Sequence, residues 1–168
     1  MSSGDKTTIF LSVLQTHKGI IYKIANAYCS DEDNRKDLVQ EITIQLWKSF
    51  DKYNESFKYS TWVYRIALNT AISFYRKENR RKQISASLSN NIIEVTDEPA
   101  KPPDAALQLL NNFIAALKEM DKALMLLYLE EKSYKEIAEI TGISQTNVAT
   151  KISRIKLLLK QKFTNINL

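Results

Sequence analysis

The segment from Asp37 to Lys82 reads DLVQEITIQLWKSFDKYNESFKYSTWVYRIALNTAISFYRKENRRK, and it decides the fold because it holds two helical patterns separated by a polar turn. The first pattern bears acids and amides on one face, and the second interleaves aromatic residues with cations. An acidic face around an apolar residue is typical of docking on a protein, whereas aromatics among cations are typical of binding nucleic acid with accessible bases. The segment therefore predicts a helical protein that joins a protein partner to a nucleic acid.

Composition favours an all-α protein. Of the 168 residues, 44% are hydrophobic, which is enough for packed cores, and glycine and proline number only three each. A hairpin-rich sheet protein would need more turn residues than this. We expect two small helical domains, residues 1–82 and 104–168, joined by a flexible linker, residues 83–103.

Hydrophobic spacing predicts four helices before the linker, or three main helices if the polar stretch 51–58 forms no helical turn. The first main helix is expected over Thr7–Tyr28. The second is expected to start at a cap, Ser30 or Asp31, and to end near Phe50. The third is expected to start at a cap, Ser60 or Thr61, and to end near Asn79. The expected buried stripes are Ile9, Val13, Ile20, Ile24 and Ala27 on the first helix, Val39, Ile42, Leu46 and Phe50 on the second, and Val63, Ala67, Thr70 and Phe74 on the third.

The linker differs in composition from the rest of the chain, because it holds serines, asparagines, acids and all three prolines. Such a stretch buries too little apolar area to offset the entropy of ordering it. Its apolar residues, Ile92, Ile93 and Val95, either dock on a partner or contact one of the domains. After the linker we expect four helices, the first capped by Asp104 and the second beginning at Asp121.

Several classes of protein are disfavoured by composition. The single cysteine, Cys29, allows no internal disulfide, and the chain shows no signal peptide and no run of membrane-spanning length, so we expect a cytoplasmic protein without membrane insertion. The only histidine, His17, is expected at the surface, and no phosphate loop, nucleophile elbow or metal-spaced Cys/His cluster appears. We therefore expect no enzyme activity, no cofactor and no metal.

The C-terminal part carries a helix-turn-helix pattern. Ser133 and Glu136 have the spacing of a capping box, Gly142 can supply a left-handed turn, and Ser144 can cap the next helix. Ala138 and Val148 sit where such a motif needs a small residue at the crossing and an apolar residue in the second helix. The pattern predicts DNA binding by the second helix, against the alternative of a helix pair with a solvated basic face.

Net charge of +5 is a weak hint of a polyanionic partner, but two basic segments separated by an acidic one are more informative. On the helix after Ser60, Trp62, Arg65, Asn69 and Arg76 form a stripe that suits unpaired bases and phosphates. The alternative is that Trp62 and Phe74 fill a core, which we prefer for Phe74. The acidic face of the preceding helix, taken alone, is more typical of an ordinary solvated surface than of a docking face.

These motifs together resemble the extracytoplasmic-function sigma factors, the smallest group of the bacterial sigma-70 family. DLVQE with Trp47, followed by STWVYRIALNTAISFYR, is similar to the family's second conserved region, and LYLEEKSYKEIAEITGISQTNVATKISRIKLLL is similar to its fourth. The resemblance covers nearly the whole chain. One departure is Thr146-Asn147-Val148-Ala149, where many members have Gly-Thr-Val followed by a cation, so the family's minus-35 preferences do not carry over.

The resemblance implies binding to core RNA polymerase and promoter DNA. It assigns docking on the clamp helices of the polymerase's largest subunit to Asp37, Gln40, Glu41, Ile44 and Lys48. It assigns the minus-10 element to Phe57, Tyr59, Ser60, Trp62, Arg65, Asn69, Arg76, Arg80 and Arg81. It assigns the minus-35 element to Ser144, Gln145, Thr146, Asn147, Thr150, Lys151, Arg154 and Lys156.

Further partners follow from the same resemblance. The polymerase's flap region would contact the chain, and an anti-sigma factor would regulate it. The linker would run toward the RNA exit channel. The alternative function is a helix-turn-helix regulator that acts without polymerase, which would usually dimerise to span two half-sites. The sequence shows no leftover apolar dimer face, so we expect a monomer.

Overall fold

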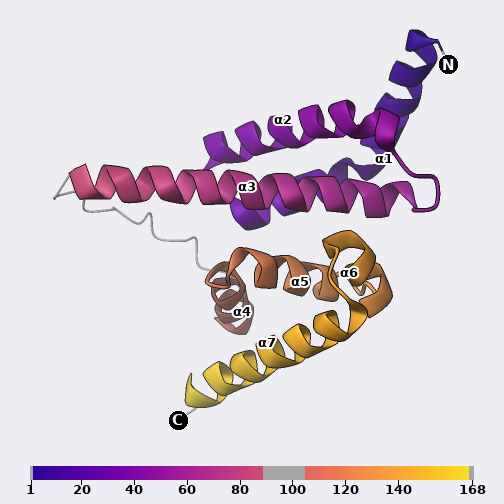
Figure 1. Ribbon diagram of the computed structural model, residues 1–168. Coiled ribbons are helices and arrows are strands. Elements are labelled where there is room, and N and C mark those ends of the chain that lie inside the picture. The colour runs from indigo at the N-terminus through magenta and orange to yellow at the C-terminus, as the bar shows by residue number, and fades with distance from the viewer. Residues whose placement is uncertain (1, 89–104, 167–168) are drawn as a thin grey trace.

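The computed structural model describes residues 2–88 and 105–166, and within these ranges the chain is helical with no strand (Figure 1). The all-α prediction is confirmed. The elements are α1 (Ser3–Tyr28), α2 (Glu32–Ser49), the short 3-10 helix η1 (Phe50–Lys52), α3 (Tyr59–Leu88), α4 (Ala105–Ala115), α5 (Glu119–Leu129), α6 (Tyr134–Thr141) and α7 (Gln145–Ile166). We call α1–α3 the N-terminal half and α4–α7 the C-terminal half.

The N-terminal half is a three-helix bundle with one 3-10 turn. Leu38, Ile42 and Leu46 of α2 are fully buried against α1 and α3. Val63 and Ala67 of α3 are also fully buried, on the side of α3 that packs into the bundle. One expected core residue is wrong, since Ile9 is exposed. The next residue, Phe10, takes its place, with its ring edge-on to Trp47 at 5.0 Å and to Phe50 at 5.4 Å.

Two helix starts differ from expectation. α3 begins at Tyr59, so Ser60 and Thr61 lie inside the helix and neither caps it, and the Trp62 amide donates to the Lys58 carbonyl. α5 begins at Glu119, two residues before Asp121, without a side-chain cap. Helix starts at Asp31 and Ser144 agree with expectation, because each side chain accepts from the backbone amide three residues later.

The third helix is longer than expected. α3 continues past Asn79 to Leu88, so the first residues of the predicted linker are helical. The rest of that linker, including Ile92, Ile93, Val95 and the expected cap Asp104, lies outside the described residues.

The helix-turn-helix prediction is confirmed in its local geometry. The Ser133 hydroxyl accepts from the Glu136 amide at 3.1 Å, and the Glu136 carboxylate accepts from the Ser133 amide at 3.2 Å. Gly142 ends α6 in the left-handed conformation, with φ of 79°. Val148 of α7 is fully buried and holds that helix against the rest of the half.

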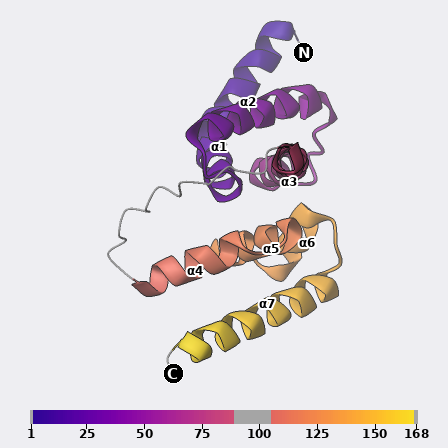
Figure 2. The same cartoon turned by 90° about the vertical axis from the view of Figure 1, so that its left-hand side faces the viewer.

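The two halves are in contact along α3. In Figure 2, which looks along the axis of α3, α1 and α2 lie on one side of it and the C-terminal half on the other. α5 and α6 supply the contacts, and α7 lies beyond them. No helix in the described ranges combines the length and apolar character that a membrane span requires.

Two glycines allow a matched test of the turn. Gly142→Ala forces a β-carbon into the left-handed region and should lower the free energy of unfolding by about 1–2 kcal/mol. Gly19→Ala, inside α1 and equally free of neighbours, should raise it by roughly 0.5–1 kcal/mol because alanine favours helices. Urea unfolding of both variants measures the difference, and equal signs would contradict this account.

Candidate nucleic-acid interfaces and docking face

The outer face of α2 is an open, mixed surface. Asp37, Gln40 and Lys48 are exposed, and Ile44 among them is 39% exposed. Glu41 is half-buried, and its carboxylate accepts a 2.9 Å hydrogen bond from the Gln45 amide. The predicted docking residues therefore do share one face, with an apolar residue at its centre.

Trp47 adds to this face and was not among the predicted docking residues. It lies three residues after Ile44 and is also 39% exposed. The Lys6 ammonium lies 4.6 Å from the centroid of its ring, and the Phe10 ring packs edge-on against it. A partly exposed tryptophan beside an exposed isoleucine forms an apolar patch on this face. An ordinary solvated helix face has no such patch, and this distinguishes the two.

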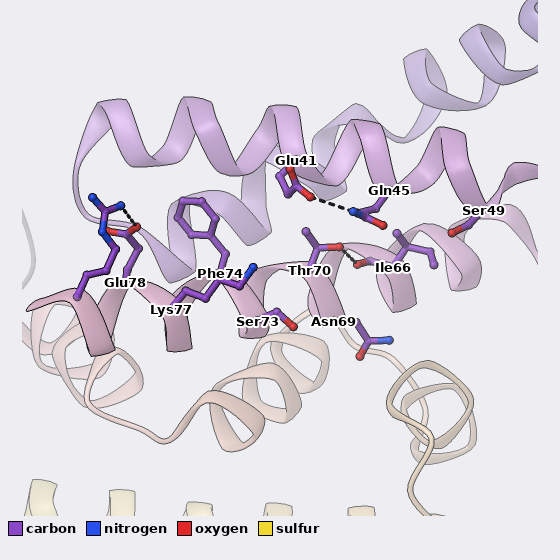
Figure 3. Close-up of a pocket in the computed structure, with 11 residues that line it drawn as sticks. Glu41, Gln45, Ser49, Ile66, Asn69, Thr70, Ser73, Phe74, Lys77 and Glu78 are labelled. Atoms are coloured by element: carbon purple, nitrogen blue, oxygen red, sulfur yellow. Dashed lines mark hydrogen bonds and ion pairs between the residues drawn. The ribbon is translucent and has the colours of Figure 1, made fainter. Parts of the chain in front are cut away.

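A groove of about 640 Å³ runs between α2 and α3 (Figure 3). Glu41 and Gln45 line it from α2, and Asn69, Ser73 and Lys77 are among the residues that line it from α3. Figure 3 shows Asn69 and Ser73 at the edge that is farther from α2. The groove thus connects the α2 face to the polar side of α3.

The loop between η1 and α3 is held in shape by its own side chains. The rings of Tyr53 and Tyr59 stack with centroids 4.3 Å apart, and the Tyr53 hydroxyl donates to the Phe57 carbonyl. The Asn54 carboxamide oxygen accepts from the Ser56 amide at 2.9 Å. Desolvation, with Tyr59 and Glu55 nearby, raises the pKa of Tyr53 above its ordinary value.

Trp62 is more buried than a base-stacking residue needs. Its side chain is 9% exposed and lies against the rings of Phe50 and Tyr53, with centroids 6.0 Å and 5.6 Å away. Trp62 therefore lies in surroundings typical of a core tryptophan, which was the alternative interpretation, and its ring supports the loop. A cavity of about 140 Å³ remains beside it, with Phe57 and Arg65 in its lining.

The other predicted minus-10 residues lie along one side of α3 and its loop. Arg65 and Asn69 are exposed, while Phe57, Tyr59 and Ser60 are half-buried. Toward the end of the helix, Arg76, Arg80 and Arg81 are exposed. Arg76 is 3.7 Å from the carboxylate of Glu119 in the C-terminal half, and Arg81 is 3.3 Å from Glu78. Two of these three arginines thus already have an acidic neighbour.

The predicted minus-35 residues gather on the first turns of α7. All are exposed except Lys151, which is half-buried. Ser144 uses its hydroxyl to cap the helix, and Thr150 donates its own to the Thr146 carbonyl at 3.0 Å. Lys156 is turned toward α5, 4.3 Å from the Tyr128 ring, and a hydrogen bond with Tyr128 raises the pKa of this lysine.

No group of three or more His, Cys, Asp or Glu side chains in the described ranges could hold a metal ion. The chemistry that these surfaces offer is hydrogen bonding, stacking and charge pairing with a large partner. The arrangement differs from a concave site that encloses a small molecule.

Family models match most of the chain. Residues 13–81 match the model described as Sigma-70 region 2, and residues 107–159 match the model described as Sigma-70, region 4. The first match contains the α2 face and the loop before α3, and the second contains the helix-turn-helix. The two regions follow one another in the order that the sequence predicted.

Curated relatives match over nearly their full length. The ECF RNA polymerase sigma factor SigW of Bacillus subtilis (strain 168) is 28% identical over 177 residues, covering 99% of this chain and 94% of SigW. The ECF RNA polymerase sigma-E factor of Escherichia coli (strain K12) is 27% identical over 174 residues, covering 96% and 90%.

Solved structures share the fold. CnrH, solved in complex with the cytosolic domain of CnrY, superposes with a TM-score of 0.66 at 19% identity, covering 95% of this chain and 90% of that one. The sigma factor RpoE, solved with the anti-sigma factor NepR from Bartonella quintana, gives 0.67 at 24% identity, covering 95% and 97%.

The loop before α3 generates a prediction. Tyr53→Leu removes both the ring stack and the hydroxyl bond, so hydrogen exchange of the amides in residues 53–58 should speed up by about tenfold. Tyr53→Phe keeps the stack and should give a smaller increase. Mass spectrometry of the exchanged peptides measures this, with Tyr22→Leu, an exposed tyrosine on α1, as the control. Equal exchange in Tyr53→Leu and wild type would show that other contacts hold the loop.

Proposed function

Because the chain belongs to the extracytoplasmic-function group of the sigma-70 family, we propose that it binds core RNA polymerase and directs promoter recognition, DNA opening and transcription initiation. The observation that carries this proposal is the presence of both sigma-70 regions, in order, in a chain that spans 94% of its relative SigW. It acts by binding and not by catalysis. Its site of action is the cytoplasm, where polymerase and promoters meet.

The α2 face docks on the clamp helices of the polymerase's largest subunit. Asp37 and Glu41 present carboxylates that pair with cations, and Gln40 and Lys48 add polar contacts at the rim. The exposed parts of Ile44 and Trp47 supply the apolar centre that such a surface needs. Leu129, Leu157 and Leu158, each about half exposed, offer apolar surface on the C-terminal half for the flap region.

The loop before α3 and the adjoining side of that helix open and hold the minus-10 element. Its Tyr53–Tyr59 stack fixes the loop before DNA arrives, which lowers the entropy cost of binding an exposed base. Asn69 offers a donor and an acceptor to a base edge, and Arg65 lies beside it. Arg80 and Arg81 meet backbone phosphates farther along α3.

The exposed side of α7 reads the minus-35 element in the major groove. Gln145, Thr146 and Asn147 lie on its first turn, where a recognition helix approaches base edges. Lys151 and Arg154 follow on the next turns and suit phosphates. This arrangement supports a division into an N-terminal domain for the minus-10 element, a linker and a C-terminal domain for the minus-35 element.

An anti-sigma factor is the regulatory partner we propose. Support comes from relatives of the same fold that were solved with such proteins, CnrH with CnrY and RpoE with NepR. A polymerase-independent helix-turn-helix regulator is not favoured. Such a regulator would have no use for the Sigma-70 region 2 segment that makes up the N-terminal half.

Reconstituted transcription tests the function directly. Core polymerase from the source bacterium, supplied with genomic promoter fragments, should start transcripts at new sites only when the purified chain is added. Mapping of the transcript ends then locates the promoters. If the chain binds promoter fragments tightly as a dimer without polymerase, and adds no transcript, the regulator is the correct description.

Charge reversal tests the docking face. Asp37→Lys and Glu41→Lys place cations where carboxylates should meet a basic surface, so the affinity for core polymerase should fall at least tenfold. Glu32→Lys is the matched control because it lies on the same helix but on the opposite side from both. Fluorescence anisotropy of labelled protein measures the affinity, and unchanged binding in both variants would remove the docking role.

Alanine substitution tests the proposed contacts of α7 with the minus-35 element. In holoenzyme, Lys151→Ala and Arg154→Ala should weaken binding to the minus-35 duplex, and each lost phosphate contact should lower the slope of log affinity against log salt by about one. Lys160→Ala removes an exposed cation farther along the same helix and serves as control. A salt titration of duplex binding gives the slopes. The role is lost if Lys160→Ala matches the other two.

A further inference from the structure

The first turns of α1 contact the end of α2 and η1 together. The Lys6 ammonium donates to the Asp51 carboxylate at 2.8 Å and lies 4.6 Å from the ring centroid of Trp47. One turn further along α1, the Phe10 ring lies edge-on to Trp47 at 5.0 Å and to Phe50 at 5.4 Å. Phe50 and Asp51 are the first two residues of η1, so side chains of α1 hold both of them.

The two α1 residues differ in burial. Phe10 is 6% exposed and belongs to the core of the bundle. The Lys6 side chain is 26% exposed and that of Asp51 is 73% exposed. An ion pair in such a place contributes little to folding, because water screens it. The charges of this pair can therefore be changed while the bundle stays folded.

η1 has few local bonds of its own. It is a single 3-10 turn without a side-chain cap, and such turns have poorer hydrogen-bond geometry than an α-helix. Tyr53 comes directly after it, and the Tyr53 amide donates to the Phe50 carbonyl at 3.2 Å. The position of Tyr53 therefore follows the position of Phe50, which Phe10 helps to set.

Ring contacts continue from η1 to the start of α3. The ring centroid of Phe50 lies 6.0 Å from that of Trp62, Trp62 lies 5.6 Å from Tyr53, and Tyr53 lies 4.3 Å from Tyr59. Together with Phe10, these rings form a continuous series of contacts. Because packed side chains leave little free space, a shift of one ring displaces the next.

η1 and the loop before α3 also line the 140 Å³ cavity beside Trp62. Lys52 of η1 contributes to that lining, as do Tyr53 and Asn54 of the loop and Arg65 of α3. Residues that bind a partner must be held within a fraction of an ångström of the productive geometry. The proposed contacts of this loop with the minus-10 element therefore depend on where η1 lies.

We propose that Lys6 and Phe10 are positioning residues for promoter opening: they hold η1, and through it the loop before α3, in the geometry that receives the minus-10 element. This inference rests on the proposed function. Both residues precede residue 13, where the match to Sigma-70 region 2 begins, so that match assigns them no role. They act through Asp51 and Phe50, and a loop that is already in place binds DNA at a lower entropy cost.

Hydrogen exchange tests the positioning without polymerase or DNA. Lys6→Glu brings two carboxylates together, and Asp51→Lys brings two ammonium groups together, so either change should speed exchange of the amides in residues 50–58 about three- to fivefold. The double variant restores opposite charges and should return the rates to within about twofold of wild type. Lys18→Glu, at an exposed lysine farther along α1, is the matched control. Unchanged exchange in both single variants would overturn the proposal.

Promoter opening tests what the positioned loop does. The assay uses preformed holoenzyme and a promoter fragment located by transcript mapping, with 2-aminopurine in the minus-10 element as the fluorescent reporter. Lys6→Glu and Asp51→Lys should each slow opening at least about threefold, while binding to the minus-35 duplex stays unchanged. The double variant should recover the wild-type rate. If it stays as slow as the single variants, the ion pair is not the cause and the proposal is wrong.

A purely structural role predicts a different result. Phe10→Leu keeps an apolar side chain but loses the ring contacts, so it should slow opening as Lys6→Glu does. Val13→Ala also removes buried volume from α1, yet it should leave opening unchanged once circular dichroism shows that the variant is folded. Equal slowing in Phe10→Leu and Val13→Ala would mean that lost stability is the cause, which contradicts the proposal. A wild type that opens no promoter would instead count against the proposed sigma function, and the exchange rates would still decide whether α1 positions the loop.

Discussion

Burial of α3 on two sides is the constraint on which the rest of the structure depends. One side, with Val63 and Ala67, packs into the bundle with α1 and α2, and the other, with Tyr64 and Leu68, lies under the C-terminal half. A helix with two apolar sides has only a narrow polar strip left. That strip carries Arg65, Asn69 and Ser73, so the proposed DNA contacts occupy the surface that packing leaves free.

The aromatic residues illustrate how packing and recognition divide between similar side chains. Trp62 and Trp47 both belong to the same region of the family, yet Trp62 is enclosed by Phe50 and Tyr53 while Trp47 keeps part of its ring in solvent. The enclosed ring holds the loop before α3 in place. The open ring enlarges the surface around Ile44. A tryptophan in a motif therefore has no fixed role until its neighbours are known.

The sequence predicted best what depends on local bonds. The capping box at Ser133 and the left-handed Gly142 are determined within a few residues, and the structure confirms both. The sequence predicted less well those features that depend on contacts between residues far apart in the chain. α3 starts at Tyr59, whose ring stacks on Tyr53, although Ser60 is a better cap by type. The contact between the halves was not predicted at all. Lysine is a residue type that is usually exposed, and Lys122 is buried only because distant parts of the chain pack around it.

The buried lysine between the halves has a consequence for solubility: the ammonium of Lys122 lies 5.0 Å and 5.1 Å from the ring centroids of Tyr28 and Tyr75. Interfaces built from leucine and isoleucine expose an apolar patch when they separate, and such patches promote aggregation. Around Lys122, these two phenols and the charged side chains of Lys23, Glu119 and Glu130 are groups that water solvates well, whereas Leu68 and Ile72 of α3 are buried farther along. Exposure of the Lys122 end to water therefore uncovers mainly polar groups, whereas exposure of Leu68 and Ile72 would uncover an apolar patch.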